Sequence, residues 1–240
     1  WCPDLALPPD TIGEIVVKGP MVTRTYLNRP EQTALAKIRE GDEIWHRMGD
    51  LGYFDTRGRL WFCGRKAHRV QTQDTVLYPV MVETIFNRHQ DVNRTALVGV
   101  DNGTDQTPVL VVEPQKGKFP ANILGRQRFA LELLALGSKY PHTCAIEHVL
   151  FYPGVFPTDV RHNAKIQREK LAVWATSALR RNGRMRDLAV APAPRPAAVT
   201  TKPASRPGHT ARALGLLGLA AGLGLGIFWL IDHLRRRRDL

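Results

Sequence analysis

The chain has 240 residues, of which 43% are hydrophobic and 23% charged, and this ordinary globular composition excludes a collagen-like or wholly disordered protein. Its three cysteines, Cys2, Cys63 and Cys144, form no CxxC motif and have no paired histidines at ligand spacing. The sequence therefore predicts neither a metal site nor a disulfide framework, and a reducing compartment is expected.

The formal net charge of +12 is concentrated near the C-terminus. Residues 180–240 hold twelve of the 34 Lys and Arg residues but only three of the 22 Asp and Glu residues. A nearly neutral globular region with a basic tail differs from a nucleic-acid reader, whose positive charge gathers on a folded face. We therefore expect no nucleic-acid partner.

Residues 1–64 are expected to be rich in β-structure. The segment Gly13–Lys18 (GEIVVK) has a strand pattern that ends at Gly19-Pro20. Apolar residues on both sides of the turn Asp55–Gly58 predict a β-hairpin. We expect these strands to pack against a larger body.

Residues 65–184 mix helix and strand patterns and are expected to form a small α+β domain. Apolar residues at helical spacing predict one helix after Pro79 and another near the end of this region. The helical positions are Val82, Ile85, Phe86 and His89 in the first helix, and Leu171, Trp174, Ala175, Ala178 and Leu179 in the second. Two short apolar strands, Ala96–Val100 and Val109–Val112, are predicted on either side of a turn-rich segment.

The remaining residues differ in composition from the rest of the chain. Residues 185–211 are rich in proline, so they are expected to form an extended linker. The segment Ala213–Ile231 has no charged residue and, as a helix, is long enough to cross the ~30 Å hydrocarbon core of a bilayer. We therefore expect a membrane helix over residues 212–232, followed by a basic tail at residues 233–240.

Three glycines of the expected membrane helix, Gly218, Gly222 and Gly226, recur at every fourth position. This small-xxx-small spacing lets two membrane helices approach closely and would allow self-association. Glycine can equally accompany alanine and leucine in a segment of biased composition, so both interpretations stay open. The orientation of the helix is also open, because basic residues lie on both sides of it.

The segments of greatest chemical interest are GEIVVKGPMVTRTY, WHRMGDL and GRLWFCGRKAHRV, which surround the predicted hairpin. They place an exposed carboxylate at Asp50 and a guanidinium at Arg65, at the two ends of that hairpin. Such a pair can bind a vicinal diol, because the carboxylate accepts from both hydroxyls and the guanidinium donates to the same edge. This arrangement suggests a ribose.

In this order and spacing, the three segments resemble the later motifs of the adenylate-forming superfamily, which includes acyl-CoA synthetases, peptide-synthetase adenylation domains and luciferases. The resemblance covers the chain from residue 1 to about residue 175. It implies that Asp50 holds the ribose of ATP or AMP and that Arg65 assists it. It also implies that residues 1–64 end a large AMP-binding domain and that residues 65–184 form the small mobile C-terminal domain.

The phosphate-gripping loop of the superfamily and its adenine- and magnesium-binding motif have no counterpart in this sequence. ATP and Mg²⁺ are the cofactors that the resemblance implies, with the magnesium ligands in a preceding part. Since the first residue is Trp1 rather than Met, we expect a fragment that is inactive alone, although a mature cleaved product also fits this start.

The superfamily places a catalytic lysine near the end of its small domain, where the charge stabilises the transition state of adenylation. The segment FPTDVRHNAKIQREKL resembles this region and puts Lys165 at the lysine position. Without the resemblance, a lone lysine is more often a solvated surface charge. Asn163-Ala164 replaces the usual glycine, which leaves Lys170 and Arg161 as rival positions.

The sequence departs from the superfamily pattern after Arg65. A hinge residue that is usually acidic or lysine is Ala67, and Asp74 stands where a glycine usually borders the pantetheine tunnel. These differences put transfer to CoA in doubt. The segments CGRKAHRV, TALVGV and RHNAKIQREKLAVWA instead resemble the olefin β-lactone synthetases of bacterial long-chain hydrocarbon synthesis.

This second resemblance implies an acyl-adenylate-forming ligase that converts a 2-alkyl-3-hydroxy fatty acid to a β-lactone through an acyl-AMP intermediate. No second substrate is needed, because the hydroxyl of the substrate itself attacks the activated carbonyl. The expected partners are a long-chain 3-hydroxy fatty acid and the membrane, with the catalytic part in the cytoplasm. The alternatives are a fatty-acyl-CoA ligase and, outside enzymes, an inactive membrane-tethered binding module.

His68 lies near Arg65 in the sequence and could act as a base toward the substrate hydroxyl, but a surface histidine without such a role is the more common case. Five other histidines are treated in the same way, and none of them is assigned a role. They are His46, His89, His142, His148 and His162.

Overall fold

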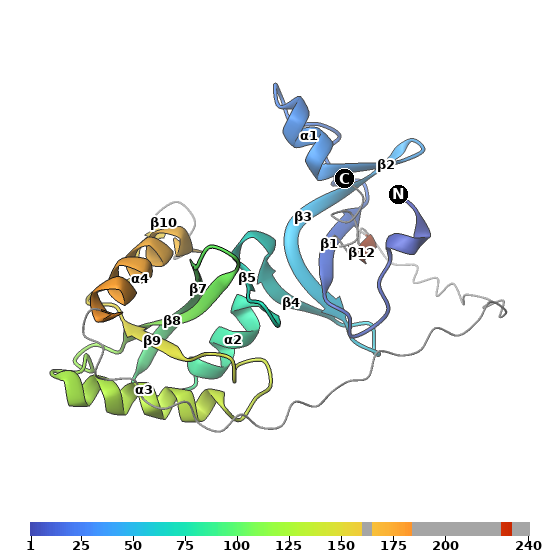
Figure 1. The fold of residues 1–240 in the computed structure, drawn as a ribbon. Coiled ribbons are helices and arrows are strands. Elements are labelled where there is room, and N and C mark those ends of the chain that lie inside the picture. The colour runs from blue at the N-terminus through green and yellow to red at the C-terminus, as the bar shows by residue number, and fades with distance from the viewer. Residues whose placement is uncertain (160–164, 184–226, 232–240) are drawn as a thin grey trace.

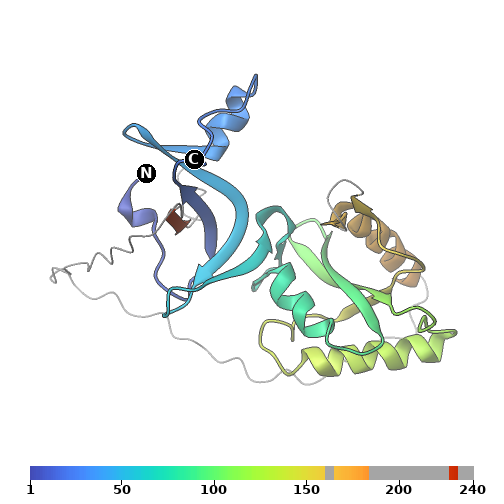
Figure 2. The same ribbon diagram turned by 180° about the vertical axis from the view of Figure 1, so that it is seen from behind.

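The computed structural model describes residues 1–159, 165–183 and 227–231. These residues form two larger β-sheets that lie side by side in both views of the ribbon (Figures 1 and 2). The chain passes from the first sheet to the second where β4 contacts α2. The proposed functional residues come from both sides of this junction.

The first sheet is antiparallel and has the strand order β12-β1-β3-β2, with β4 also pairing with β3. Its strands are β1 (Gly13–Lys18), β2 (Lys37–Glu40), β3 (Glu43–Phe54), β4 (Leu60–Arg65) and β12 (Ile227–Ile231). The long strand β3 pairs with β2 through its first residues and with β4 through its last residues. Val16 and Trp45 are buried in its small core, where Trp1 stacks on Trp45 with ring centroids 4.4 Å apart.

Two sequence predictions for this region are confirmed. The strand Gly13–Lys18 has the expected bounds, and the hairpin forms around the turn Asp55–Gly58, where Asp55 accepts backbone hydrogen bonds from Arg57 and Arg59. Between β1 and β2 the chain also forms the short helix α1 (Pro30–Ala36), and a 3-10 turn, η1 (Pro3–Leu5), precedes β1.

The expected membrane helix over residues 212–232 is not borne out where the structure describes it. Ile227–Ile231 form the strand β12, whose backbone pairs with the outer edge of β1. A free strand edge has unpaired backbone groups, and an added strand satisfies them. The rest of that segment, the linker and the basic tail lie outside the described residues. Within the described part of the chain, no helix is long and apolar enough to cross a membrane.

The second sheet has the order β7-β8-β9, with β7 and β8 antiparallel and β8 and β9 parallel. Its strands are β7 (Val92–Asp101), β8 (Gln106–Pro114) and β9 (His148–Phe151), and the helices beside it are α2 (Pro79–Phe86), α3 (Ile123–Gly137) and α4 (Arg168–Gly183). The two predicted strands and both predicted helices of this region are present. His89 lies beyond the end of α2, because that helix stops at Phe86.

Alternation along the strands of the second sheet produces two cores. Leu97 and Leu110 face the side covered by α2 and α3, where Phe86 and Leu133 pack. Their neighbours, such as Val98, face α4 on the other side. Successive side chains of a strand point to opposite faces, so both faces of this sheet are covered. Helices and strands are thus combined in this region, as expected for the small α+β domain.

Short elements connect the two sheets and the last helix. A 3-10 turn, η2 (Lys66–His68), follows β4, and the small hairpin of β5 (Val70–Gln71) and β6 (Val76–Leu77) follows η2. A second small hairpin, β10 (Thr158–Asp159) with β11 (Lys165–Ile166), precedes α4. The division into domains at residue 64 stays a prediction.

Candidate functional site

The hairpin of β3 and β4 brings Asp50 and Arg65 together. They are direct partners in the antiparallel ladder, and a β-bulge follows this pair between Leu51 and Gly52. Each of the two residues comes directly after a glycine with positive φ, 69° at Gly49 and 121° at Gly64. Only glycine adopts such angles without steric cost, so the Gly-Asp and Gly-Arg dipeptides have a local structural reason.

The Asp50 carboxylate lies next to a cation but lacks a complete set of hydrogen bonds. Arg65 Nε is 3.2 Å from Asp50 Oδ1, and Arg65 Nη1 donates to the Met48 carbonyl oxygen at 3.1 Å. The Nε contact does not have hydrogen-bond geometry, so Oδ1 is buried without a hydrogen-bond partner among the described residues. Buried polar atoms are nearly always satisfied, and an exception at this position indicates a missing ligand donor.

Asp50 is less exposed than the sequence suggested, with 18% of its side chain accessible, whereas the Arg65 side chain is 50% accessible. Burial raises the pKa of Asp50, and the positive charges of Arg65 and Lys165 oppose this shift. The orphaned carboxylate oxygen fits a neutral donor such as a sugar hydroxyl. The residues present therefore fit the ribose of a nucleotide.

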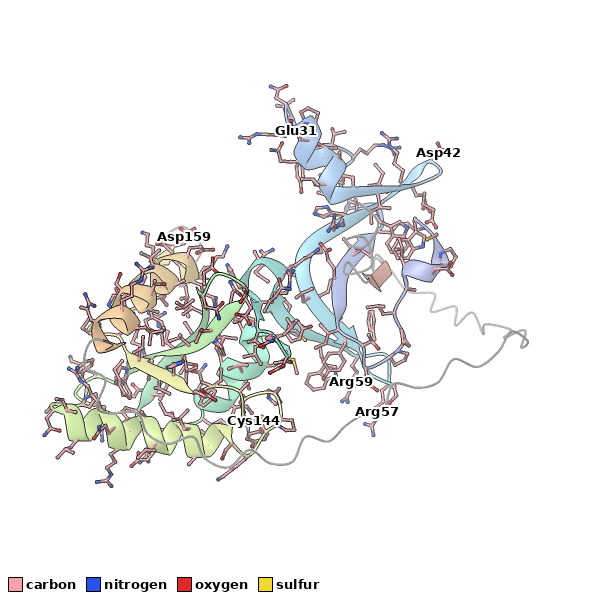
Figure 3. All side chains as sticks on the ribbon, viewed as in Figure 1. Glu31, Asp42, Arg57, Arg59, Cys144 and Asp159 are labelled. Atoms are coloured by element: carbon pink, nitrogen blue, oxygen red, sulfur yellow. The ribbon has the colours of Figure 1, made fainter. Side chains whose placement is uncertain are left out.

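Lys165 belongs to the same cluster of charges, although 115 residues separate it from Asp50 in the sequence. It begins β11, is exposed, and lies opposite Asp159 in the β10–β11 pair; Figure 3 shows Asp159 beside α4. Its charge acts on the pKa of Asp50 and also on that of His68. Asp50 and Arg65 are thus in direct contact, and Lys165 is linked to them through its charge.

The structure describes one of the two positions that rival Lys165 as the catalytic cation. Lys170 lies on the exposed surface of α4, and its charge is not among the causes that shift the pKa of Asp50. Arg161 lies outside the described residues. The charge of Lys165 acts on Asp50 and that of Lys170 does not, which favours Lys165 over Lys170.

A buried ion pair holds the beginning of α4, directly after the strand that carries Lys165. Both oxygens of Glu83 accept hydrogen bonds from Arg168 Nη2, at 2.9 and 2.7 Å, and Glu83 Oε1 also accepts from the backbone N of Leu97 at 2.8 Å. Glu83 is 8% exposed, and burial raises its pKa while Arg168 opposes the shift. This contact ties α4 to α2 and β7.

His68 is more buried than expected for a surface histidine, with 11% of its side chain accessible. Its Nε2 lies 3.1 Å from Glu169 Oε1 on α4. Burial lowers the pKa of His68; the Glu169 contact opposes this effect, and the charges of Arg168 and Lys165 reinforce it. The imidazole is therefore neutral near pH 7.

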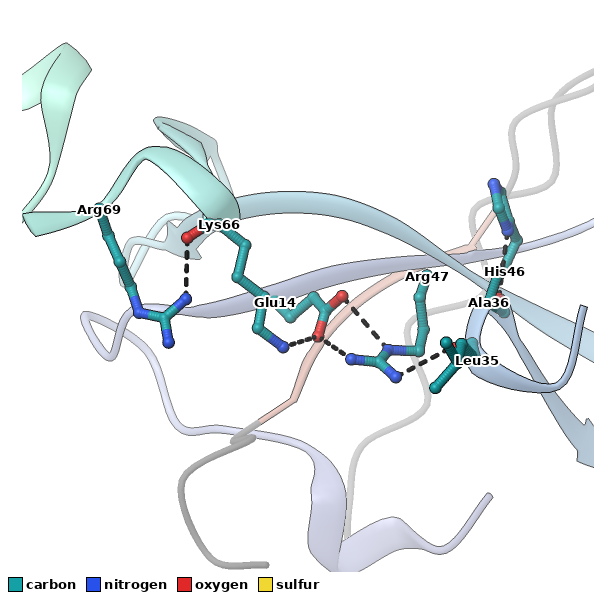
Figure 4. A network of polar contacts seen from close by, with 7 residues as sticks. All are labelled: Glu14, Leu35, Ala36, His46, Arg47, Lys66 and Arg69. Atoms are coloured by element: carbon teal, nitrogen blue, oxygen red, sulfur yellow. Dashed lines mark hydrogen bonds and ion pairs between the residues drawn. The ribbon is translucent and has the colours of Figure 1, made fainter. Parts of the chain in front are cut away.

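A second polar network, which the sequence did not indicate, joins the first sheet to η2 (Figure 4). Glu14 is 3% exposed and accepts hydrogen bonds from Arg47 on β3 and from Lys66 on η2, both at 2.8 Å to Oε2. Burial alone would raise the pKa of Glu14, but the bonds from these two cations outweigh it and lower the pKa. This network fixes the residue that follows Arg65.

The described residues contain no group of three or more His, Cys, Asp or Glu side chains that could hold a metal ion. What these residues offer is the orphaned acceptor of Asp50, the guanidinium of Arg65 and the exposed ammonium of Lys165. This set suits the sugar and phosphate of a nucleotide.

The fold is similar to that of adenylate-forming enzymes. The structure is similar to that of the amide bond synthetase McbA from Marinactinospora thermotolerans, with a TM-score of 0.58 and 26% identity over 70% of this chain and 32% of that chain. The O-succinylbenzoate coenzyme A synthetase MenE from Bacillus subtilis, solved in complex with AMP, shows the same fold with a TM-score of 0.56 and 23% identity over 69% of this chain and 31% of that chain.

Proteins with similar sequences have more specific names. The chain is 51% identical to an olefin β-lactone synthetase from Xanthomonas campestris over 180 residues, which cover 73% of this chain and 32% of that protein. It is 47% identical to an olefin β-lactone synthetase from Stenotrophomonas maltophilia over 75% of this chain and 32% of that protein. A 2-succinylbenzoate–CoA ligase from Geobacillus kaustophilus is 41% identical over 47% of this chain and 22% of that protein.

No protein-family model matches the sequence. The relatives and the solved structures nevertheless agree, and the chain belongs to the AMP-binding, adenylate-forming ligases. It spans about a third of the length of the curated relatives that it matches.

Proposed function

We propose that this chain is the C-terminal part of an ATP-dependent enzyme that activates a 2-alkyl-3-hydroxy fatty acid as an acyl adenylate and closes it to a β-lactone. The observation that carries the proposal is the Asp50–Arg65 pair with its orphaned carboxylate oxygen, in a chain that is 51% and 47% identical to two olefin β-lactone synthetases over 73% and 75% of its length. The charge of Lys165 also acts on Asp50. Below, the complete enzyme means a protein that contains this sequence together with the preceding part that the proposal implies.

In this proposal Asp50 accepts hydrogen bonds from the ribose hydroxyls, and Arg65 stabilises the carboxylate and donates to the same edge. Lys165 approaches the α-phosphate and the substrate carboxylate, where its charge stabilises the transition state of adenylation. The side chains that contact the fatty-acid chains and magnesium lie in the preceding part.

The loop between β5 and β6 supports lactone closure rather than transfer to CoA. Asp74 lies in this loop with an exposed side chain, in a turn closed by a hydrogen bond from Thr72 Oγ1 to the Thr75 carbonyl oxygen. In the superfamily a glycine at this position lets the backbone approach pantetheine closely, and a carboxylate adds bulk and negative charge. An internal hydroxyl already has a high effective concentration, so it needs no thiol channel.

The test is to incubate the complete enzyme with ATP, Mg²⁺ and a 2-alkyl-3-hydroxy fatty acid, with and without CoA. We expect pyrophosphate, AMP and a β-lactone in both reactions, identified by mass spectrometry. A product that requires CoA, with no lactone in its absence, would replace this proposal with the second candidate, a fatty-acyl-CoA ligase, which the similarity to a 2-succinylbenzoate–CoA ligase favours.

We also propose that the enzyme works at the cytoplasmic face of a membrane and that residues 212–240 attach it there. The support is the absence of charged residues in Ala213–Ile231 and the apolar character of the proposed substrate. Of this segment, Ile227–Ile231 pair with β1 in this structure. Removing residues 212–240, which also removes strand β12, should move the complete enzyme from the membrane to the soluble fraction, and thermal unfolding would show whether the truncated protein is folded. A truncated protein that stays with the membrane would contradict this attachment.

A further inference from the structure

A histidine that the adenylation chemistry does not use lies in the same charge cluster. His68 is three residues after Arg65, is largely buried, and contacts Glu169 on α4 through Nε2 at 3.1 Å. Lys165, three residues before Arg168, acts electrostatically on both Asp50 and His68. The imidazole is therefore close to the residues proposed to hold the adenylate.

The contact with Glu169 determines which ring nitrogen can act. Glu169 is ionised near neutral pH, because hydrogen bonds, first from its own backbone and then from His68, outweigh burial and lower its pKa. A carboxylate at 3.1 Å favours the tautomer with the proton on Nε2, which leaves the lone pair on Nδ1. A base whose second nitrogen is held by a carboxylate is the arrangement that catalytic histidines use.

We propose that His68 is the general base of lactone closure and that Glu169 is its positioning residue. This inference rests on the proposed function. His68 Nδ1 takes the proton of the substrate 3-hydroxyl, and the resulting oxygen nucleophile forms a bond to the carbonyl carbon of the acyl adenylate. The bond between that carbon and the phosphate oxygen breaks, AMP leaves with the electron pair, and the imidazolium returns its proton to water.

The surroundings of His68 suit a base that works near pH 7. The charged groups that act on it are Glu169 and Arg168 on α4 and Lys165 on β11. Burial and the two cations keep the imidazole neutral, whereas Glu169 raises its pKa and so increases its basicity. An ideal general base has a pKa close to the working pH, so that it is deprotonated there and still basic enough to accept the proton.

The proposal separates two steps that different residues serve. Lys165 is assigned to adenylation, which releases pyrophosphate, and His68 to closure, which releases AMP and the lactone. A residue that only supported the structure around Lys165 would affect pyrophosphate release. Single-turnover reactions that measure pyrophosphate and lactone in the same sample therefore distinguish a base from a structural residue.

The experiment compares the complete enzyme with His68→Gln, Glu169→Gln and the control His89→Gln. His89 is a good match because its side chain is also mostly buried, 17% accessible, and its Nε2 lies 3.5 Å from Glu132 on α3. For His68→Gln we expect pyrophosphate release within about twofold of the unmodified enzyme and lactone formation slower by about 10²-fold or more, with acyl adenylate accumulating. The control should change neither rate.

Glu169→Gln has a signature that a structural role would not produce. In the unmodified enzyme, lactone formation should rise with pH through an inflection below 6.5, because burial lowers the pKa of His68 from that value. Removing the Glu169 charge should move the inflection to lower pH and reduce the rate at its plateau. The inflection should be absent in His68→Gln.

Two results would overturn the assignment. Lactone formation at the normal rate in His68→Gln would show that His68 is not the base. Equal slowing of pyrophosphate release and lactone formation would show that His68 only supports the structure around Lys165. Failure of the proposed function looks different, because the unmodified enzyme itself would then release pyrophosphate without making any lactone. Thermal unfolding of each variant would show whether it is folded.

Discussion

Asp50 Oδ1 and Arg65 Nε lie 3.2 Å apart across the β3–β4 ladder, yet the carboxylate oxygen has no hydrogen-bond partner among the described residues. A structural ion pair normally satisfies its acceptors, particularly buried ones. The pair is therefore better suited to a hydroxyl ligand than to stabilising the hairpin, and the first prediction tests this difference.

Asp50→Ala in the complete enzyme should raise the KM for ATP by about 10- to 100-fold, because two hydrogen bonds from the ribose are lost and each charge-assisted bond contributes roughly 1 kcal/mol or more. Thermal stability should change little. The matched control is Asp55→Ala in the same hairpin, since Asp55 accepts hydrogen bonds from Arg57, Arg59 and Trp61. An unchanged KM for ATP together with a lower melting temperature would make Asp50 a structural residue.

Lys165→Ala should slow pyrophosphate release by on the order of 10²-fold, because a charge that stabilises the transition state is removed. Binding of ATP should be affected much less, since the lysine acts mainly during reaction. Lys170→Ala on the exposed face of α4 is the control and should be close to normal. Equal losses in the two variants would point to general electrostatic attraction of ATP rather than to a specific role of Lys165.

The sequence predicted contacts between residues that are close together in the chain better than contacts between residues that are far apart in it. The strand Gly13–Lys18 and the hairpin around Asp55 follow from local patterns, and both are present. The pairing of Asp50 with Arg65 followed from the same hairpin. The neighbourhood of Lys165 could be predicted only through resemblance, because no local pattern connects residues that are so far apart in the chain.

The buried acids Glu14 and Glu83 were missed for the same reason. Their cationic partners are 33 and 52 residues away for Glu14 and 85 residues away for Glu83, and isolated acids in a strand or helix pattern look like solvated residues. Each acid forms its ion pairs only when two elements of secondary structure pack against each other. Nothing in the spacing of the sequence could have indicated these contacts.

The helix α3 was missed because its apolar residues do not form a single stripe. Phe129 and Leu133 are buried, whereas Leu124 and Leu131 are exposed, so the periodic signal is weak. One local sign was present, since Asn122 caps the helix by accepting a hydrogen bond from the backbone N of Gly125.

Glu83→Ala should lower the free energy of unfolding by about 3–5 kcal/mol, because it leaves the Arg168 charge and the Leu97 amide without their buried partner. The double variant Glu83→Leu with Arg168→Met should be less unstable than the sum of its single changes, since it removes both charges together. Chemical denaturation followed by tryptophan fluorescence measures these differences. Strictly additive losses would show that the two side chains do not interact.

Glu14→Gln should also destabilise the protein by about 3 kcal/mol or more, because the cations Arg47 and Lys66 would then lie against a neutral amide in a site where Glu14 is only 3% exposed. Glu43→Gln is the matched control. Glu43 pairs with Lys18 on the surface, with 62% of its side chain accessible, so the cost should be about 1 kcal/mol or less.

The pH dependence of this loss follows from the lowered pKa of Glu14. A carboxyl group whose pKa is lower in the folded state than its ordinary value of 4.5 stabilises the fold above that pH. The contribution should disappear as the pH falls through the folded pKa, because Glu14 then becomes protonated like the amide that replaces it. The stabilities of the original protein and Glu14→Gln should therefore converge in acid and differ fully above pH 5. A constant difference across this range would show that the shape of the side chain matters there, and not its charge.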